Sequence, residues 1–331
     1  MSNTPIEITQ EERQLLSKAL SAPIEVIPFE HNGLSRHSFA IGANNKQYFV
    51  KRFTGPDDAS LKLEKHIAQL LADSRISTEL IAQAEYFLIY EFIPHRVLDE
   101  LNLPLSDKIA LTCDLASKLH QVSSKQIQRL DVAKTTLSLL RKCQLSDALH
   151  CVIEAMIHQF VPQATQENLV VCHGDLNFAN IILPTKRDNA KQGVDVTTHE
   201  MSEELLLIDF ESCCLAPPAF DVAMCIAINR LDKQMEIDKL AKLFQKNLQE
   251  FDKSLYDFDS EMVTRYLALC FLINGLWYFE RAMKNNSEKY LLLALTQFQG
   301  IDEYFIEEDE LTDKMRQEAN NLRLTTMREP L

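Results

Sequence analysis

The stretch that decides the fold is VVCHGDLNFANIILP, residues 170–184, in which a polar turn joins two short apolar runs. A further apolar run, LLLIDFE at residues 205–211, ends in acidic residues. Short apolar runs bounded by polar turns are typical of buried strands. The pattern predicts a strand, a polar turn and a second strand, followed by a third strand that ends in a carboxylate.

The polar residues of this stretch have the chemistry and spacing of a phosphoryl-transfer site. Asp175 could accept the proton of an attacking hydroxyl group, while Asn180 and Asp209 could hold a Mg²⁺ ion that neutralises nucleotide phosphates. Mg²⁺ prefers hard oxygen ligands and keeps positions open for phosphate and water. We expect His173 to orient the turn through a hydrogen bond rather than to take part in the chemistry. A lone His-x-Asp would more often be a capped loop, but polar residues that recur at successive strand ends favour a catalytic site.

A lysine at the end of an earlier apolar run supplies a cation for the phosphates. Lys51 follows QYFV, and Glu64 lies thirteen residues later in ASLKLEKHIAQLLA (59–72), which has helical periodicity. We predict that Lys51 reaches the α- and β-phosphates and that Glu64 holds it there as an ion pair. Standing alone, the two residues would be interpreted as an exposed strand lysine and a solvated helix glutamate.

The turn before that lysine lies where a phosphate-covering loop would be. It reads NGLSRHS at 32–38, and the backbone N–H groups of Gly33, Leu34 and Ser35 could bond phosphate oxygens. The turn holds one glycine only, so an ordinary hairpin turn is the alternative.

A late apolar run carries the chain's single tryptophan. Trp277, Tyr278 and Glu280 combine aromatic faces with a carboxylate, a combination that binds organic cations. Aromatic residues at helical spacing are more often core, so core packing stays open here. The surrounding run at 267–279 is too short to span a bilayer and predicts a buried helix.

Two further acidic residues have supporting roles in this prediction. Asp221 follows two prolines at the start of a predicted helix, where it would cap the helix or brace a neighbouring loop. Glu211 is two residues beyond Asp209, so in an extended strand both carboxylates would point the same way. Glu211 would then help to position the metal ion, or would be ordinary surface.

The order of the predicted elements favours an α+β fold with a small antiparallel-sheet lobe and a larger, mainly helical lobe. Thr9 and Glu12 fit a capping box that opens a first helix. Strands are expected at 24–29, 38–43, 47–53, 76–82 and 86–92. We place the N-terminal nucleotide-binding lobe at 1–93 and the C-terminal catalytic and substrate-binding lobe at 94–331. A polar insertion at 185–204 is expected to form an exposed hairpin, and the charged tail beyond Glu310 is expected to fray.

The composition of the 331 residues is that of a soluble globular protein, with 46% hydrophobic and 25% charged residues. The formal net charge of −14 argues against nucleic acid or an anionic membrane as a partner and is compatible with a cationic small substrate. The eight cysteines form no CxxC pair, and the polar N-terminal residues lack the regions of a signal sequence. We therefore expect reduced thiols and a cytoplasmic location.

At these motifs the sequence resembles the aminoglycoside phosphotransferase and choline kinase superfamily, with thiamine kinase and the bacterial choline kinases as the nearest resemblance. NGLSRHSFAIGANNKQYFVKRF is similar to the family's nucleotide loop and lysine strand, and LASKLHQV to its helix before the catalytic loop. HGDLNFAN, LLLIDFE and PPAFDVA resemble the catalytic loop, the metal aspartate and the next helix start. The resemblance implies a protein-kinase-like fold, ATP and Mg²⁺ as cofactors, and adenine contacts around Glu91 and Ile93.

The sequence therefore predicts an ATP- and Mg²⁺-dependent kinase for a hydroxyl of a small, cationic alcohol such as choline, ethanolamine or thiamine. An aminoglycoside or sugar kinase is the first alternative, and a non-catalytic nucleotide-binding protein with the same fold is the second. A protein kinase is disfavoured, because Phe-Glu instead of Phe-Gly follows Asp209 and because Asn177 stands where a lysine is expected. The sequence leaves open the alcohol, the nucleotide and the oligomeric state.

Overall fold

The computed structural model describes residues 7–28, 38–162, 168–185, 201, 203–305 and 310–326. The chain divides into two compact units, each assembled from two segments. One consists of Met1–Val122 and Phe178–Cys213, and the other of Ser123–Asn177 and Cys214–Leu331. The lobe boundary after residue 93 stays a prediction.

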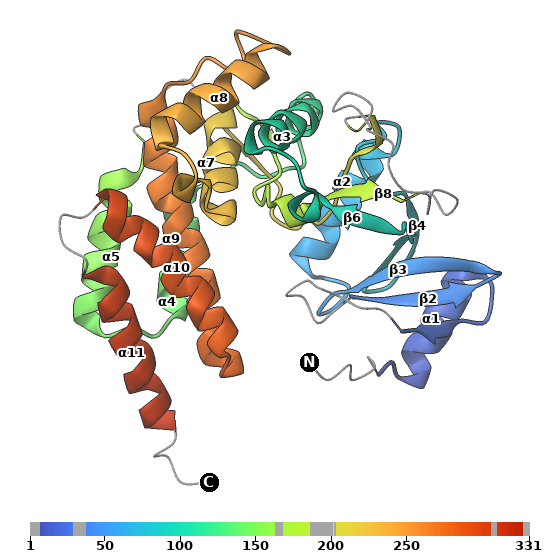
Figure 1. The fold of residues 1–331 in the computed structure, drawn as a ribbon. Helices are drawn as coiled ribbons and strands as arrows, with labels where there is room; N and C mark the ends of the chain where they lie inside the picture. The colour runs from blue at the N-terminus through green and yellow to red at the C-terminus, as the bar shows by residue number, and fades with distance from the viewer. Residues whose placement is uncertain are drawn as a thin grey trace. The chain divides into compact units, whose positions relative to one another are not determined.

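An antiparallel five-stranded sheet forms the body of the first unit (Figure 1). Its strand order is β1-β2-β3-β5-β4, and every predicted strand of this sheet is present, β2 with the predicted ends and the other four with shifted ends. The strands are β1 (Glu25–Ile27), β2 (Ser38–Ala43), β3 (Lys46–Arg52), β4 (Leu80–Ala84) and β5 (Phe87–Glu91). The tight turn between β2 and β3 places Asn44 and Asn45 at φ 51° and 59°, a region that asparagine tolerates better than most residues.

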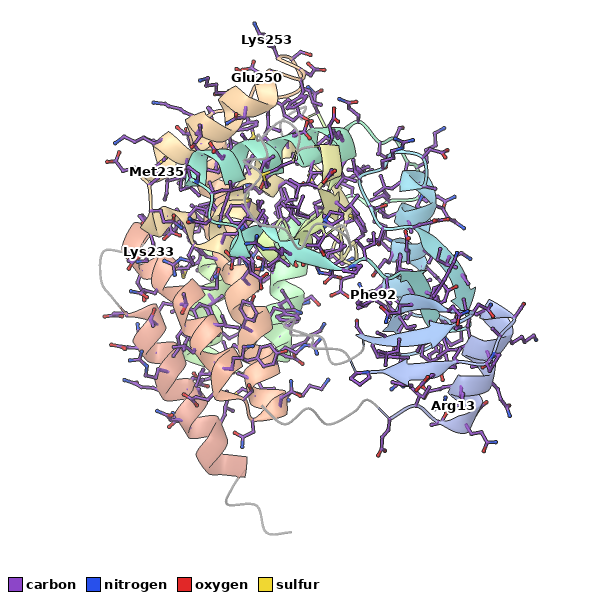
Figure 2. The ribbon with its side chains drawn as sticks, turned by 45° about the vertical axis from the view of Figure 1, so that its right-hand side comes forward. Arg13, Phe92, Lys233, Met235, Glu250 and Lys253 are labelled. Atoms are coloured by element: carbon purple, nitrogen blue, oxygen red, sulfur yellow. The ribbon has the colours of Figure 1, made fainter. Side chains whose placement is uncertain are left out.

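Helix α1 (Gln10–Leu20) covers one face of this sheet. The predicted capping box is present, since Thr9 and Glu12 exchange both backbone-to-side-chain hydrogen bonds. Arg13, labelled in Figure 2, donates to the carbonyl of Ile24 and ties the helix to the chain that enters β1. Leu16 packs with Phe39, Ile41, Val50 and Phe87 of the sheet, and this cluster is the first core.

Helix α2 (Ala59–Leu71) belongs to a second core. Its Leu61 and Ala68 pack with Leu88 and Tyr90 of β5. Residues on a strand alternate between the two faces, so Phe49 of β3 packs against this second cluster while Val50 belongs to the first. Lys51 lies one position after Val50 and is therefore on the same face as α2.

The first unit also holds a small three-stranded sheet and a helix. The strand order is β6-β8-β9, with antiparallel pairs throughout. Its elements are β6 (His95–Val97), η1 (Leu98–Glu100), α3 (Leu105–His120), η2 (Phe178–Asn180), β8 (Ile181–Pro184) and β9 (Leu206–Leu207). The end of the predicted insertion is helical, because the N–H of Leu205 donates to the carbonyl of Met201 at 3.1 Å. Residues 186–200 and 202 of that insertion lie outside the described residues.

The second unit is mainly helical, as predicted, and contains one antiparallel strand pair. Strand β7 (Val170–Cys172) pairs with β10 (Cys214–Ala216). The helices are α4 (Val132–Lys142), α5 (Asp147–Phe160), α7 (Pro218–Asn229), η3 (Leu231–Lys233), α8 (Ile237–Gln249), α9 (Ser260–Asn285), α10 (Glu288–Phe305) and α11 (Leu311–Thr326). The charged tail thus begins as a regular helix, α11, where fraying was expected.

Helix α9 is the core of this unit, which confirms the buried helix expected at 267–279. Among the described residues it is the one helix with the length and apolarity to cross a bilayer. However, 72% of its most apolar window is buried inside the protein, as is usual for the central helix of a folded domain.

Helices α9 and α10 lie side by side (Figure 1) and approach closely at two glycines. A Cβ atom on Gly275 would lie 2.7 Å from the ring of Phe298, and one on Gly300 would lie 2.7 Å from the ring of Phe271. Each helix therefore inserts a phenylalanine over a glycine of the other. This reciprocal packing fixes the register of the pair.

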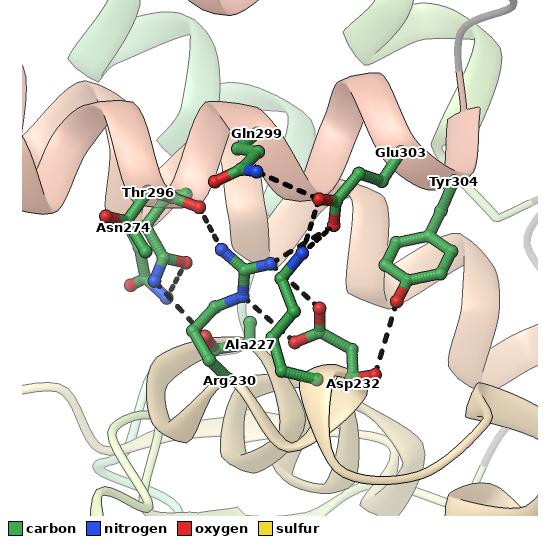
Figure 3. A network of polar contacts seen from close by, with 10 residues as sticks. Ala227, Arg230, Asp232, Asn274, Thr296, Gln299, Glu303 and Tyr304 are labelled. Carbon is green, nitrogen blue, oxygen red and sulfur yellow. Dashed lines mark hydrogen bonds and ion pairs between the residues drawn. The ribbon is translucent and has the colours of Figure 1, made fainter.

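A charged network also joins α7, α10 and the turn after α7 (Figure 3). Arg230, at φ 49°, donates to both carboxylate oxygens of Asp232, at 3.0 and 2.8 Å, and to the carbonyl of Thr296. Glu303 contacts Arg230 and Lys233. Asp232 is buried, so its charge depends on this pairing.

The glycine packing gives a test of the core. Gly300→Ala should lower the free energy of unfolding by about 1–3 kcal/mol, because the new methyl group overpacks against Phe271. Gly55→Ala is the matched control, since a Cβ there has no neighbour within 4 Å, and it should unfold like the parent protein. Chemical denaturation of the three proteins measures both effects, and equal stability of all three would contradict the packing argument.

Candidate active site

Lys51 is the centre of a partly buried ionic cluster in the first unit. Its Nζ donates to Glu64 Oε2 at 2.7 Å and Oε1 at 2.9 Å, and to Asp209 Oδ1 at 2.7 Å. Glu64 is 2% exposed, and Tyr90 donates its hydroxyl to Glu64 Oε1 at 3.1 Å. The predicted ion pair between Lys51 and Glu64 is therefore present.

The sequence contains a signal for this pair. Glu64 occupies the apolar stripe of α2, in line with the buried Leu61, Ala68 and Leu71. A carboxylate in such a stripe needs a partner from the element beneath it. Lys51, on the face of the sheet that α2 covers, is that partner.

The charges of the cluster influence one another. Burial alone would lower the pKa of Lys51, but the carboxylates of Glu64, Asp209 and Glu211 raise the pKa well above its ordinary value. Burial raises the pKa of Glu64, and the nearby charge of Asp209 adds to the rise, against the opposing effect of Lys51. Three carboxylates around one ammonium group leave an excess of negative charge. Such a site attracts a further cation.

The small sheet brings two of the predicted metal ligands together. Ile181 at the start of β8 pairs with Leu207 at the end of β9, and the N–H of Ile208 donates to the carbonyl of Asn180 at 3.0 Å. Asn180 and Asp209 therefore lie at the same end of this antiparallel pair. Both predicted ligands come from the first unit.

The donor set of this cluster suits a hard divalent ion. One carboxylate oxygen each from Glu64, Asp209 and Glu211 lie within 4.8 Å of one another. Carboxylate and amide oxygens are the ligands that Mg²⁺ prefers, and the excess negative charge favours it. Asp209 and Glu211, with Asn180 beside them, are the residues that would hold the ion.

The backbone conformation at Asp209 and Glu211 differs from the predicted one. We expected Asp209 and Glu211 to share one side of an extended strand. Instead β9 ends at Leu207, Asp209 has φ 69°, and Glu211 lies in a turn. The left-handed residue redirects the chain, and this conformation is uncommon for a residue with a side chain. The expectation of an extended strand was wrong, although the two carboxylates do converge.

The predicted catalytic loop lies in the second unit and is held by Asp221. Asp221 is 1% exposed, and its two carboxylate oxygens accept the N–H groups of His173 and Gly174, each at 2.9 Å. Gly174 has φ 76°, a conformation that glycine adopts without strain. Bracing of the loop was one of the two predicted roles of Asp221. The other was wrong, because Asp221 lies within α7 and Pro217 is the N-cap residue.

The hydrogen bond through which His173 was predicted to orient the turn is present. His173 is fully buried, and its Nδ1 accepts the N–H of Asp175 at 3.3 Å. This bond places the ring proton on Nε2 when the imidazole is neutral. Asn229 of α7, which the sequence did not single out, donates to the carbonyl of Leu176 at 3.0 Å and anchors the far side of the loop. Asp175 itself is partly exposed, which leaves it accessible to a substrate hydroxyl.

The aromatic residues of α9 form a cluster with α10. The ring of Trp277 lies 5.2 Å from that of Tyr278 and 6.2 Å from that of Tyr290, measured between centroids. Burial raises the pKa of Tyr278, and the charges of Asp175 and Tyr290 contribute. Asp175 thus acts electrostatically on Tyr278. Tyr290 and the nearby Arg281 were missed because they lie outside the quoted motif.

The predicted nucleotide contacts are only partly described. Gly33, Leu34 and Ser35 lie outside the described residues. Glu91 ends β5, where it pairs with Tyr48 and donates its N–H to the carbonyl of Glu79 at 3.0 Å. The carbonyl of Ile93 lies 2.6 Å from His95 Nδ1. Adenine binding at Glu91 and Ile93 stays a prediction.

The sequence of this chain matches a known protein family. The profile of the family described as choline/ethanolamine kinase matches residues 27–258, more than two thirds of the chain. The chain belongs to the choline/ethanolamine kinase family. The matched range includes Lys51, Glu64, the predicted catalytic loop and Asp209. A search of curated proteins found no significant match.

Solved structures of kinases share the fold at low sequence identity. The Plasmodium vivax ethanolamine kinase superposes with a TM-score of 0.62 at 15% identity, covering 90% of each chain. Choline kinase LicA from Streptococcus pneumoniae gives 0.64 at 14% identity, covering 93% of this chain and 100% of the other. A spectinomycin phosphotransferase gives 0.54 at 16% identity, with 95% and 98% covered. The predicted protein-kinase-like α+β fold is confirmed, and the chain is a small-molecule kinase.

The buried ion pair can be tested through stability. Glu64→Ala should cost about 3 kcal/mol, near the lower end for breaking a buried ion pair, because Lys51 keeps Asp209 as a partner. The matched control is Asp57→Ala, which breaks the exposed pair with Lys62 and should leave the free energy of unfolding nearly unchanged. Denaturant titration compares them. Similar losses in both variants would contradict the special role of the buried pair.

The brace on the catalytic loop gives a second test. In Asp221→Asn the amide has one acceptor oxygen, so one of the two buried N–H groups loses its partner at a cost of about 1.5–3 kcal/mol. We expect kcat to fall more than KM for the nucleotide rises, since the loop carries Asp175. Asp238→Asn, in the exposed first turn of α8, should change neither. Full activity in Asp221→Asn would remove the brace from the mechanism.

Proposed function

We propose that this kinase transfers the γ-phosphoryl group of ATP, with Mg²⁺, to a hydroxyl of a small cationic alcohol of the choline, ethanolamine or thiamine type. The observation that carries the proposal is the cluster of Lys51, Glu64 and Asp209. A buried lysine held between two carboxylates is the arrangement that kinases use at the nucleotide phosphates.

Nucleotide binding is supported by the relatives. A structure of LicA contains AMP, and the structure of the spectinomycin phosphotransferase contains ADP and spectinomycin. Both share the fold of this chain. We extend nucleotide binding to this chain because the same fold here carries the Lys51 cluster in its antiparallel-sheet unit.

The chemistry of each residue gives its role in phosphoryl transfer. Lys51 binds phosphate oxygens, and Glu64 keeps its ammonium group in place and charged. When bound, Mg²⁺ supplies neutralisation of phosphate charge, with Asp209, Asn180 and Glu211 as its ligands. Asp175 accepts the proton as the alcohol oxygen forms its bond to the γ-phosphorus and the bond to ADP breaks.

The cationic character of the alcohol rests on charge and aromatic surface. The chain carries a formal net charge of −14, which favours approach of a cation. The rings of Trp277 and Tyr290 lie beside the buried ring of Tyr278, and aromatic faces attract organic cations. The carboxylate of Glu280 is the neighbouring acidic group.

One alternative substrate class has an observation in its favour. A spectinomycin phosphotransferase and an aminoglycoside-3'-phosphotransferase of type VIII share the fold, with TM-scores of 0.54 and 0.51. An aminoglycoside kinase therefore belongs in any substrate screen. The second alternative, a nucleotide-binding protein without catalysis, predicts binding of Mg²⁺-ATP with no transfer to any alcohol.

An ATP-consumption screen over choline, ethanolamine, thiamine, aminoglycosides and sugars tests the proposal. We expect the highest kcat/KM with a cationic amino or ammonium alcohol. Asp175→Ala should lose turnover by at least about a hundredfold, the lower range of general-base catalysis, while still binding nucleotide. Asp238→Ala should retain full turnover. Normal turnover by Asp175→Ala would exclude the assigned base, and a best substrate among the sugars would exclude the cationic alcohol.

A further inference from the structure

We propose that Arg281 occupies the cation-binding face of Trp277 and competes there with the substrate, so that it sets the preference among cationic alcohols. This inference deepens the proposed function and rests on it. It assigns a specificity role to a residue that the sequence motif did not include.

The geometry of the pair is that of a bound cation. Trp277 and Arg281 are four residues apart on α9 and so lie on the same side of the helix. The guanidinium carbon of Arg281 lies 4.9 Å from the centroid of the Trp277 ring, within the range of a cation–π interaction. The neighbouring rings of Tyr278 and Tyr290 extend the aromatic surface around this position. The face that would hold a substrate cation is thus already covered by a cation of the chain itself.

Arg281 is weakly held and can be displaced. Its side chain is 41% exposed, and its Nε lies 3.8 Å from the nearest oxygen of Glu280, too far for a hydrogen bond. Ion pairs with that exposure contribute little free energy. Arg230, which lies over Phe271, differs because it is 12% exposed and is bonded to Asp232 at 2.8 Å. Arg230 is therefore a fixed part of the core, whereas Arg281 covers its ring without such anchors.

The aromatic cluster of Trp277, Tyr278 and Tyr290 is influenced by the charge of the predicted base. Tyr278 is directly adjacent to Trp277, and the charge of Asp175 contributes to the raised pKa of Tyr278. Both residues belong to the second unit. A cation bound on these rings would thus lie in the electrostatic field of the predicted base.

The competition affects cationic alcohols unequally. A quaternary ammonium group donates no hydrogen bond and depends on aromatic faces for recognition. A primary ammonium group donates up to three hydrogen bonds and can use hydroxyl and carboxylate acceptors instead. Arg281 should therefore disfavour quaternary ammonium alcohols more than primary amino alcohols.

The chain provides a direct probe for this idea, because Trp277 is its single tryptophan. Tetramethylammonium and choline are titrated into the native protein and into Arg281→Gln while the tryptophan emission is recorded. We expect Arg281→Gln to bind both about two- to fivefold more tightly, the factor that corresponds to losing an exposed cation–π competitor. In turnover, KM for choline should fall by a similar factor and KM for ethanolamine should change less.

Arg265→Gln is the matched control. Arg265 lies on the same helix, is 42% exposed and pairs with Glu261, so the variant removes the same charge sixteen residues from Arg281. Its affinity for both cations should equal that of the native protein. Unchanged or weaker binding by Arg281→Gln, an equal gain in Arg265→Gln, or no response of the tryptophan in any variant would each overturn the inference.

The same data distinguish failure of this inference from failure of the proposed function. If alcohols are phosphorylated while the emission of Trp277 does not respond to them, the inference is wrong and the kinase activity stands. If cations bind at Trp277 in the predicted order but no cationic alcohol is phosphorylated, the proposed function is wrong and the competition at Trp277 stands.

Discussion

The buried ammonium group of Lys51 is the constraint on which the first unit depends. It is surrounded by carboxylates from α2 and from the segment after β9, which are 145 residues apart in the chain, as Glu64 and Asp209. Removing such a charge from water is costly unless partners surround it. The sheet, α2 and the end of β9 therefore have to come together for Lys51 to be tolerated. The same charges that the fold has to pair are those that bind phosphates and a divalent ion in kinases.

The second unit also contains a buried charged group, which is paired with the backbone and not with another charge. Asp221 is a buried carboxylate whose partners are two backbone N–H groups of the predicted catalytic loop. An acceptor with two oxygens can hold two successive N–H groups only if the backbone turns sharply, and Gly174 at φ 76° allows this turn. His173 then completes the loop by accepting the N–H of Asp175. These neighbours hold the backbone of Asp175.

Much of the fold and of the site could be predicted from the sequence where a local signal exists. The capping box at Thr9, the strands of the five-stranded sheet and the buried helix at 267–279 each have a periodic or capping pattern. The ion pair between Lys51 and Glu64 could be predicted because the motifs further along the chain give both residues a role at the phosphates, and the position of Glu64 in the apolar stripe of α2 agrees with it. The left-handed conformation of Asp209 could not be predicted, because the apolar run in LLLIDFE indicates a continuous strand and tertiary contacts decide where that strand ends. Arg281 was missed for a related reason: an arginine on a helix is ordinarily solvated, and only the neighbouring ring of Trp277 gives it a role.

The division of the chain into two interleaved units affects how the protein can be made. The first unit receives residues 178–213 only after residues 123–177 of the second unit have been synthesised. Strand β6 therefore leaves the ribosome long before its partner β8 exists, and Lys51 lacks its contact with Asp209 over the same interval. During synthesis the nascent chain holds an unpaired strand edge and an incompletely neutralised lysine, features that expose a folding intermediate to aggregation. Synthesis rate and chaperone supply should accordingly influence the yield of this protein.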